Sequence, residues 1–351
     1  MSDIDNDTLD ANATVTCAST FQGHSSSVWG VTVLDADRIV SGSYDNTLKL
    51  WEVSTQRCVA TFQGHSDGVW CVAVLDADRI VSGSYDNTVK LWEVSTQRCV
   101  ATFQGHSHYV GCVTVLDADR IVSGSYDKTL KLWEVSTQRC VATFQGHSNY
   151  VVCVAVLDAD RIVSGSNDHT LKLWEVSTRR CVATFQGHSS TVWCVAVLDA
   201  DRIVSGSYGS PLKLWEVSTQ RCVATFQGHS DGVWCVAVLD ADRIVSGSYD
   251  NTVKLWEVST QRCVATFQGH SNYVVCVAVL DADRIVSGSY DKTLKLWEVP
   301  NDDPLKMLSA LQTGNDVNKL SKLLTLCESD DLEADDILAV SHLHFRDICA
   351  R

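Results

Sequence analysis

The chain has 351 residues, 45% of them hydrophobic, so it is long enough to bury a sizeable core. Its net charge of −15 and isoelectric point near 5.0 argue against nucleic acids and anionic membrane surfaces as partners, because both bind clustered Lys and Arg. No apolar run approaches the roughly 20 residues that span a bilayer, so we expect no membrane segment.

The chain begins with an acidic stretch, residues 1–13, which we expect to form an N-terminal tail. MSDIDNDTLDAN contains four acids, no base and no apolar run, so it does not have the pattern of a signal peptide. The next stretch, CASTFQGHS at 17–25, matches the CVATFQGHS that recurs later in the chain. The N-terminal region therefore already contains part of a repeated unit.

A repeat of 41 residues organises the chain from there on. FQGHS and LWEV each occur seven times at that spacing, and residues 64–104 are identical to residues 228–268. In the copy that begins at Gly64, four short β-rich runs, VWCVAVL, RIVSGSY, TVKLWEV and RCVATFQ, are separated by turn residues. Connections this short allow only antiparallel neighbours, and a repeated four-stranded sheet is typical of a propeller blade.

The motifs agree with that architecture. Gly-His opens each unit and Trp-Glu closes its third run, so residues 14–299 resemble the WD-repeat β-propeller family, with Trp-Glu in place of the usual Trp-Asp. The resemblance implies an all-β fold, a seven-bladed β-propeller of four-stranded antiparallel blades. The last unit stops after its third run at Val299, so we expect residues 14–22 to complete the last blade and close the ring, which hides edge strands.

Each unit also contains a Ser, a His and an Asp, so a hydrolase must be considered. Six copies of a catalytic triad argue against this, since an enzyme needs one tuned site. In the WD-repeat family these residues and the Trp form a structural hydrogen-bonded network, although the Ser-Gly-Ser of each unit leaves open which serine takes part. The other network residues expected here are His24, Asp45, Trp51, His65, Asp86, Trp92, His106, Asp127, Trp133, His147, Asp168, Trp174, His188, Trp215, His229, Asp250, Trp256, His270, Asp291 and Trp297.

Blade five departs from this pattern. It reads YGSPLKLW, with Gly209 where the other units have Asp and Pro211 where they have Thr. Its network should be incomplete, and Pro211 removes one backbone donor. We therefore expect blade five to be locally the weakest.

Within the 41-residue repeat, four positions show three or more residue types. They are the second, third and fifth residues after the His and the residue after the turn Asp, which meet at one sheet edge of an up-and-down blade. In the WD-repeat family this edge belongs to the top face, where the third and fifth positions and the residue before the turn Asp line the rim and central opening. The ligand-binding residues expected on that basis are Ser27, Trp29, Tyr44, Gly68, Trp70, Tyr85, Tyr109, Tyr126, Tyr150, Val152, Asn167, Thr191, Trp193, Tyr208, Gly232, Trp234, Tyr249, Tyr273, Val275 and Tyr290.

The side chains at these positions favour recognition over drift. Where the fifth residue after the His is Trp, the third is Ser, Gly or Thr; where the third is Tyr, the fifth is Gly or Val. Each blade thus has one large aromatic of the kind that dominates binding hot spots. The opposite loops, LDADR and VSTQR, hardly vary, although we expect them to be equally tolerant. The pattern resembles recently amplified WD-repeat arrays of fungal incompatibility and innate-immune-type receptors.

The cysteines and the C-terminal segment give further predictions. The fifteen cysteines recur in apolar runs such as RCVATF and form no Cys-x-x-Cys pair, which predicts buried, reduced thiols, no metal site and no cofactor. Reduced thiols favour a cytoplasmic location, with the nucleus as an alternative. Residues 300–351 contain ten acids, five bases and runs of helical spacing, which predict a short acidic helical extension.

These observations predict a non-enzymatic recognition or scaffold propeller. We expect a monomer that binds a protein or peptide through its top face. The alternative is a carbohydrate-binding propeller, because aromatic platforms ringed by Asn, Asp and His also suit sugars. A hydrolase would need one site unlike its relatives, and the only blade that differs, blade five, has lost groups.

Overall fold

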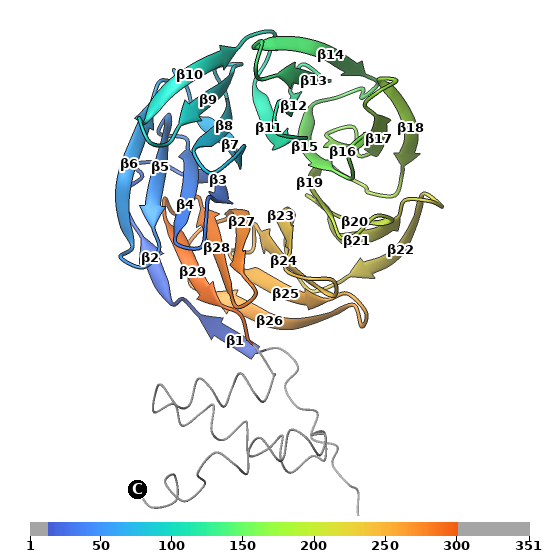
Figure 1. Ribbon diagram of the computed structural model, residues 1–351. Helices are drawn as coiled ribbons and strands as arrows, with labels where there is room; N and C mark the ends of the chain where they lie inside the picture. The colour runs from blue at the N-terminus through green and yellow to red at the C-terminus, as the bar shows by residue number, and fades with distance from the viewer. Residues whose placement is uncertain (1–12, 301–351) are drawn as a thin grey trace, which may run out of the picture. The chain divides into compact units, whose positions relative to one another are not determined.

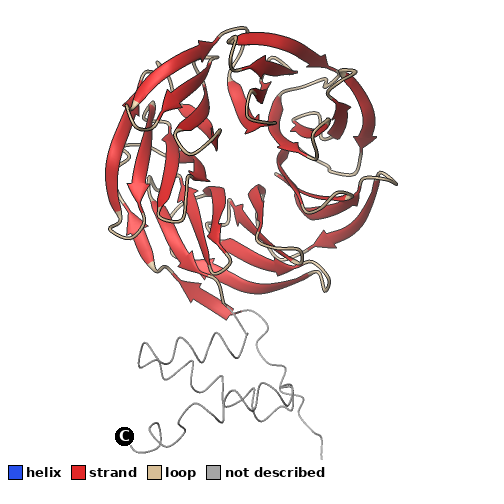
Figure 2. Ribbon diagram, in the orientation of Figure 1, coloured by secondary structure: helices blue, strands red, loops and turns tan. Residues whose placement is uncertain are grey.

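The computed structural model of the chain describes residues 13–300, which contain strands and turns but no helix. The strands form seven sheets arranged in a ring around a central axis, as Figures 1 and 2 show. The predicted seven-bladed β-propeller is therefore confirmed. The tail expected before residue 13 and the helical extension expected after residue 300 lie outside the described residues.

Blade one shows the arrangement that the other blades repeat. From the axis outward it consists of β3 (Val28–Val33), β4 (Arg38–Ser43), β5 (Thr47–Glu52) and β6 (Arg57–Gln63), each antiparallel to the next. The pairing continues through tight turns, since the connections are too short for any crossover.

The remaining blades keep this strand order. Blade two consists of β7 (Val69–Val74), β8 (Arg79–Ser84), β9 (Val89–Glu93) and β10 (Arg98–Phe103). Blade three consists of β11 (Val110–Val115), β12 (Arg120–Ser125), β13 (Thr129–Glu134) and β14 (Arg139–Gln145). Blade four consists of β15 (Val151–Val156), β16 (Arg161–Ser166), β17 (Leu171–Glu175) and β18 (Arg180–Phe185). Blade five consists of β19 (Val192–Val197), β20 (Arg202–Ser207), β21 (Ser210–Glu216) and β22 (Arg221–Phe226). Blade six consists of β23 (Val233–Val238), β24 (Arg243–Ser248), β25 (Val253–Glu257) and β26 (Arg262–Gln268). Blade seven contains β27 (Val274–Asp281), β28 (Arg284–Ser289) and β29 (Leu294–Glu298).

The hydrophobic core lies between neighbouring blades. Val40, Leu48 and Phe62 of blade one pack in one cluster with Ile80 and Trp92 of blade two, and an equivalent cluster joins blades two and three. Every blade thus buries its apolar face against the next, which explains why no single repeat could be stable alone.

The glycine of each Ser-Gly-Ser is required by this packing. A Cβ atom on Gly83 would lie 2.6 Å from Cγ1 of Val110 in the next blade and 2.7 Å from Sγ of Cys71 in its own. A close-packed interior has no room for such an atom. The second strand can therefore bring its backbone against the neighbouring blade only with glycine here.

The N-terminal strands close the ring and also reach a second blade. β2 (Ser19–Phe21) pairs antiparallel with β29 and supplies the outer strand that blade seven lacks. β1 (Ala13–Thr16) pairs instead with β26 of blade six, parallel to it and as its fifth strand (Figure 1). The expectation that residues 14–22 complete the last blade holds for β2 and for Ala18, which donates its backbone N–H to the carbonyl oxygen of Leu296. It is wrong for residues 14–16, because the chain bends at Ala18 and these residues pair with blade six.

Candidate functional site

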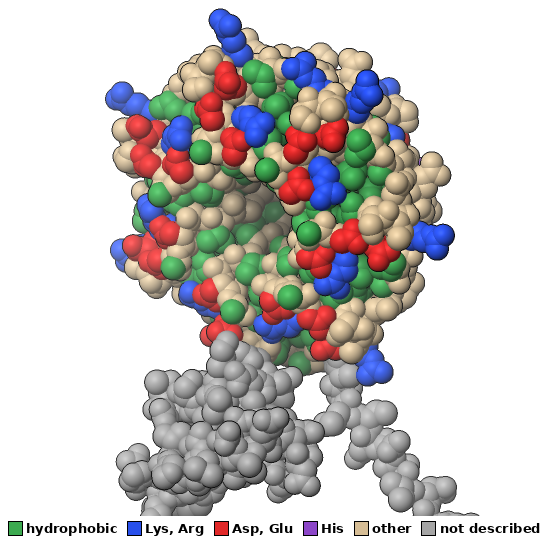
Figure 3. Space-filling model, turned by 45° about the vertical axis from the view of Figure 1, so that its right-hand side comes forward, with side chains coloured by type: hydrophobic (Ala, Val, Ile, Leu, Met, Phe, Trp, Pro, Cys, Tyr) green, Lys and Arg blue, Asp and Glu red, His purple; other side chains and the backbone are tan. Residues whose placement is uncertain are grey.

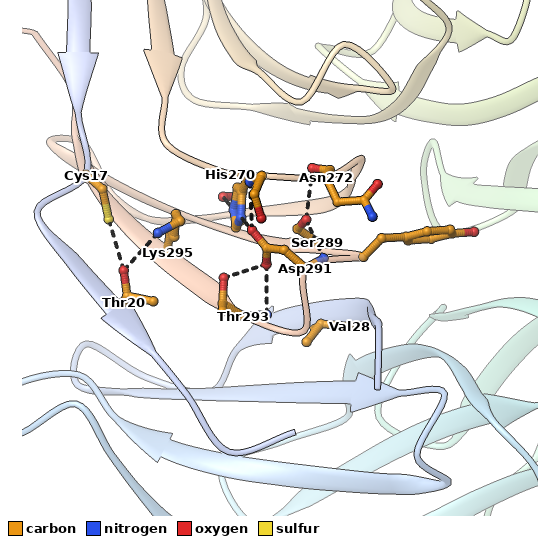
Figure 4. Close-up of polar contacts among 12 residues, drawn as sticks. Cys17, Thr20, Val28, His270, Asn272, Ser289, Asp291, Thr293 and Lys295 are labelled. Carbon is orange, nitrogen blue, oxygen red and sulfur yellow. Dashed lines mark hydrogen bonds and ion pairs between the residues drawn. The ribbon is translucent and has the colours of Figure 1, made fainter. Parts of the chain in front are cut away.

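A hydrogen-bonded network within the blade sets the position of the top-face loops, and Figure 4 shows its part around His270, Asp291, Thr293 and Ser289 in blade seven. Trp297 donates from Nε1 to Oγ of Ser287, 2.7 Å away. The same Oγ lies 2.8 Å from Nε2 of His270, whose Nδ1 lies 2.7 Å from Oδ2 of Asp291. Since an indole can only donate, the hydroxyl hydrogen of Ser287 is left for Nε2, and the Nδ1–H of the imidazole faces the carboxylate.

Both serines of Ser-Gly-Ser have a role. The first serine, Ser287 in blade seven, bonds to the His and the Trp. The sequence alone left open which of the two serines joins the network. The second, Ser289, donates to the carbonyl oxygen of Asn272 (3.0 Å) and accepts from the backbone N–H of Asp291 (3.0 Å). It therefore ties the loop before the first strand to the turn between the second and third strands.

In this network the Asp side chain is ionised and the His side chain is neutral. Burial raises the pKa of Asp291, but the hydrogen bonds from His270 and Thr293 outweigh burial and hold the pKa below its ordinary value. Burial lowers the pKa of His270. At neutral pH an ionised carboxylate thus accepts from a neutral imidazole, and the pair is satisfied inside the blade.

This geometry supports the structural interpretation of the Ser, His and Asp. The His–Asp contact recurs in every blade except blade five, at 2.7–2.8 Å. The network serine of every blade is fully buried at 0% exposure. A serine nucleophile must reach its substrate, so these hydroxyls are not placed for hydrolysis.

Blade five keeps half of the network. His188 still contacts Ser205 (2.7 Å), and Trp215 still donates to that serine (2.8 Å). Because Gly209 has no carboxylate, Nδ1 of His188 is buried without a hydrogen-bond partner. Oγ of Ser207, at the start of the altered turn, is also buried without one. Burial, together with the charge of Lys213, lowers the pKa of His188 to about 4. The expected incomplete network is therefore present in the structure.

The turn of blade five also has a different shape. In the other blades the residue after the turn Asp has left-handed backbone, for example Asn46 at φ 69° and Lys292 at φ 72°. In blade five Ser207 pairs with Ser210, so Tyr208 and Gly209 form a tighter two-residue connection. A pocket of about 260 Å³ opens beside it, lined by Tyr208, Gly209, Pro211, Gln227, His229, Ser230, Asp231 and Gly232. Asp231 occupies the variable second position after the His, whereas sequence reasoning did not single out Gln227 or Ser230; the lone Gly-Ser-Pro turn was the available signal for the pocket.

The variable residues of the top face are matched across blade boundaries. The third residue after each His meets the residue before the turn Asp of the preceding blade. Where both are tyrosines their rings pack: Tyr109 on Tyr85 at 4.4 Å between centroids, Tyr150 on Tyr126 at 4.5 Å, and Tyr273 on Tyr249 at 4.2 Å. Variation at one position is thus coupled to its neighbour.

The other boundaries use smaller pairs. Thr191 donates from its hydroxyl to Oδ1 of Asn167. A Cβ on Gly68 would lie 2.6 Å from Cδ2 of Tyr44, and one on Gly232 would lie 2.7 Å from the carbonyl oxygen of Tyr208. At the last boundary Ser27 donates to the carbonyl oxygen of Tyr290 (3.5 Å). Small third residues therefore make room for the preceding tyrosine.

The fifth-position tryptophans pack together around the axis. Trp193 stacks on Trp234 with centroids 3.8 Å apart, Trp29 lies 4.1 Å from Trp70, and Trp29 also contacts Trp234 at 6.1 Å. Trp70 and Trp234 are only 8% and 7% exposed. Apolar rings at the inner strands pack on one another rather than face solvent, so Trp70 and Trp234 offer little surface to a ligand, as the apolar CVAV run that follows each of them suggests.

Other expected ligand-binding positions are buried as well. They are Gly68, Val152, Thr191, Gly232 and Val275. The regularity of one large aromatic per blade is largely a packing rule: on Gly111 a Cβ would lie 3.3 Å from the ring of Tyr126. The large hydrophobic residues still exposed on the top face are Tyr44 (50%), Tyr208 (53%) and Tyr273 (39%). Ser27, Trp29, Tyr85, Tyr109, Tyr126, Tyr150, Asn167, Trp193, Tyr249 and Tyr290 are partly buried.

The loops opposite the top face are held by hydrogen bonds. In blade one, Asp35 binds Arg38 (2.6 Å), and Asp37 accepts from the backbone N–H and hydroxyl of Ser54 (2.7 and 2.8 Å). The Asp–Arg pair recurs in all seven blades. Figure 3 shows acidic and basic side chains side by side around the central opening of one face. The expected equal tolerance of LDADR and VSTQR is therefore wrong, because the Asp and Arg side chains of the first loop and the Ser and Thr of the second have bonding partners.

The thiols fall into two classes. Cys112, Cys153, Cys194, Cys235 and Cys276 on the inner strands are buried, and burial raises the pKa of each. The outer-strand thiols Cys58, Cys99, Cys140, Cys181 and Cys222 are exposed. The prediction that the thiols are buried is therefore wrong for these five, since they lie on the outermost strand of each sheet. No disulfide bond links the cysteines of residues 13–300.

Within residues 13–300, no group of three or more His, Cys, Asp or Glu side chains is arranged to hold a metal ion. The same part of the chain contains no helix that is long and apolar enough to cross a membrane.

Comparison with known families agrees with the blades. The profile of the WD domain, G-beta repeat, matches residues 15–52, 56–93, 97–134, 138–175, 179–216, 220–257 and 261–298. The chain is a WD-repeat protein. Each match begins near one outer strand and ends at the third strand of the next blade, so the WD repeat is offset from the blade by one strand. WD-repeat propellers typically serve as non-enzymatic protein-interaction scaffolds. A comparison with curated proteins finds no significant match.

Proposed function

We propose that this WD-repeat propeller is a monomeric, non-enzymatic recognition module whose top face binds a protein or peptide. The observation that carries the proposal is the group of exposed tyrosines, Tyr44, Tyr208 and Tyr273, at the face where the repeats differ most. Exposed tyrosines offer rigid contact area with a polar end, and such residues are frequent anchors of interfaces.

Blade-to-blade differences give that face an individual pattern. Tyr44 and Tyr208 lie over Gly68 and Gly232 and stay half exposed, whereas Tyr109 and Tyr150 pack on a neighbouring tyrosine. The pocket beside Tyr208 exists where blade five has lost its Asp. Seven nearly equal repeats thus present an asymmetric surface, which is what a specific partner requires.

The buried network serines support a binding role over catalysis, since none of them reaches solvent. The free, exposed thiols of the outer strands support a reducing compartment, the cytoplasm or the nucleus. Carbohydrate remains the competing ligand class, because the pocket beside Tyr208 combines one aromatic ring with the polar side chains of Gln227 and Asp231. A glycan array with the purified propeller separates these two classes of ligand.

The test is partner capture by the intact chain and by matched variants. Replacing Tyr44, Tyr208 and Tyr273 with Ala should weaken capture by about 1–4 kcal/mol for each tyrosine that is an anchor. The control adds bulk to the opposite face by changing the exposed Ala77, Ala118 and Ala159 to Gln. Loss of capture in the control and full capture by the tyrosine variant would place the binding surface on the opposite face.

A further inference from the structure

One outer blade edge of this propeller already holds an added strand. β1 lies parallel to β26, with Ala13 opposite Ala265 and Thr16 opposite Gln268. An outermost strand has one row of backbone N–H and C=O groups without a sheet partner, and another extended segment can pair with it. Blade six therefore shows how a strand fits this edge.

Five other blades have an edge of the same sequence. β6, β10, β14, β18 and β22 all read RCVATF, as β26 does, and each is the outermost strand of its sheet. In all six strands the register shifts at the Val, so this residue is an unpaired bulge. The described residues of β1 pair with the four residues after the bulge, Ala265–Gln268.

The exposed fractions of equivalent residues differ between blade six and the five open edges. Val59, Val100, Val182 and Val223 are 46–50% exposed and Val141 is 37% exposed, whereas the equivalent Val264 is partly buried. Cys263 is likewise less exposed than its five outer-strand equivalents. Lys254 and Thr266 are 8% and 6% exposed, although their counterparts in the other blades are only partly buried. The open edges thus carry apolar and backbone surface that blade six hides.

We infer that the edges of β6, β10, β14, β18 and β22 are docking sites for an extended segment of a partner protein. The segment runs parallel to the edge strand, has small or β-branched residues like Ala13-Thr14-Val15-Thr16, and pairs with the Ala-Thr-Phe-Gln after the bulge. This surface is separate from the top face, so the inference stands independently of the function proposed above.

Charge specifies the partner further. Each open edge strand begins with an exposed arginine: Arg57, Arg98, Arg139, Arg180 or Arg221. In a parallel pair the residues that precede the docked segment lie toward that arginine. The sequence before β1 contains four acids and no base. A partner segment with acidic residues before its strand therefore complements these edges, whereas a basic one would be repelled.

The exposed outer-strand thiols provide the assay. The full chain is used with Cys17, Cys327 and Cys349 changed to Ser, so that native alkylation, counted by intact mass, reports Cys58, Cys99, Cys140, Cys181 and Cys222 as the fast thiols. The probe is a synthetic peptide of residues 3–18 with Cys17→Ser. Its control carries Thr14→Pro and Val15→Pro, which remove the backbone donors needed for pairing.

A four-residue strand should bind with a dissociation constant on the order of 1 mM, so about 2 mM peptide should slow alkylation of the five thiols about threefold. The proline peptide should leave the rate unchanged. An unchanged rate with the first peptide, or equal slowing by both, overturns the inference and shows that bulge and arginine simply blunt these edges. Hydrogen exchange of the RCVATF fragments provides a second readout: protection in the presence of the first peptide supports docking, and its absence contradicts it.

Discussion

Tyr150 of blade four stacks on Tyr126 of blade three, with ring centroids 4.5 Å apart and ring planes 23° from parallel. The two residues belong to adjacent repeats and sit at positions that vary within the chain. Their contact shows that top-face variation has two consequences at once, since a change alters both the surface and the joint between blades.

The contribution of this contact between blades to stability can be measured by unfolding. Tyr150→Ala should lower the free energy of unfolding by about 1 kcal/mol, because it removes an aromatic pair. Tyr44→Ala should cost less than about 0.5 kcal/mol, since Tyr44 is 50% exposed. The double variant Tyr126→Ala, Tyr150→Ala should show a coupling of about 0.5–1.5 kcal/mol in denaturant titrations. Equal effects of Tyr150→Ala and Tyr44→Ala would contradict this account of the joint.

The sequence predicted the parts of the fold that repeat. The spacing of Gly-His, Ser-Gly-Ser, turn Asp and Trp predicted the four strands of each blade. The CASTFQ segment before the first full unit resembles a fourth strand, which predicted that residues such as Phe21 close the ring. Blade five was predictable for the same reason, because Gly209 and Pro211 remove identifiable hydrogen-bonding groups.

The parts that depend on contacts between repeats were not predictable. Whether Trp70 faces solvent depends on Trp29 of the preceding blade, which fills the same space near the axis. Nothing in the ATVT sequence of β1 distinguishes β26 from β29 as its partner, since both offer an outer edge. The opposite loops looked tolerant because their Asp and Ser residues are common turn formers, yet Asp37 binds Ser54 of the next turn.

Blade five can be repaired. Gly209→Asp with Pro211→Thr should give Nδ1 of His188 an acceptor and restore the two threonine donors, adding about 1 kcal/mol. A Cβ at 209 would lie 3.2 Å from Cβ of Ser190, so a small loop shift is needed. Fragments containing YGSPLKLW are unique in the chain, so hydrogen exchange can follow this blade separately.

In the native chain that fragment should exchange faster than the YDNTVKLW fragments of blades two and six. In the repaired variant the difference should shrink. Gly209→Asp alone, which lacks the threonine donors, should gain less than the double change. Slower exchange in native blade five than in blade two would refute the view that it is the weakest.

The unpaired His188 makes stability depend on pH. Its pKa is about 4 in the folded chain and 6.5 ordinarily, so as the pH falls from 6.5 to 4 the unfolded chain takes up a proton that the folded chain does not. This group therefore contributes stability above pH 6.5 and loses it on acidification. In the repaired variant the new carboxylate raises the pKa of His188, so denaturant unfolding at pH 7 and pH 5 should show a smaller loss. An equal loss in both proteins would exclude His188 as the cause.

The fifteen cysteines should all be reduced. Alkylation under denaturing conditions without a reductant, followed by intact mass measurement, should label every thiol of protein kept reducing until quenching. A stoichiometric disulfide would argue against the cytoplasmic or nuclear location proposed above.

Removal of the N-terminal strands in two steps should separate ring closure from edge covering. Deletion of residues 1–16 removes β1 and leaves blade six with an open edge like those of its neighbours, so thermal unfolding should change little. Deletion of residues 1–22 also removes Phe21, which is 1% exposed and packs against Trp51 at 5.9 Å between centroids. Loss of a buried phenylalanine alone costs about 3–5 kcal/mol, and β29 becomes an unpaired edge. The longer deletion should therefore lower the melting temperature sharply and produce self-association in size-exclusion chromatography. If both truncated chains melt alike and stay monomeric, β2 does not hold the ring closed.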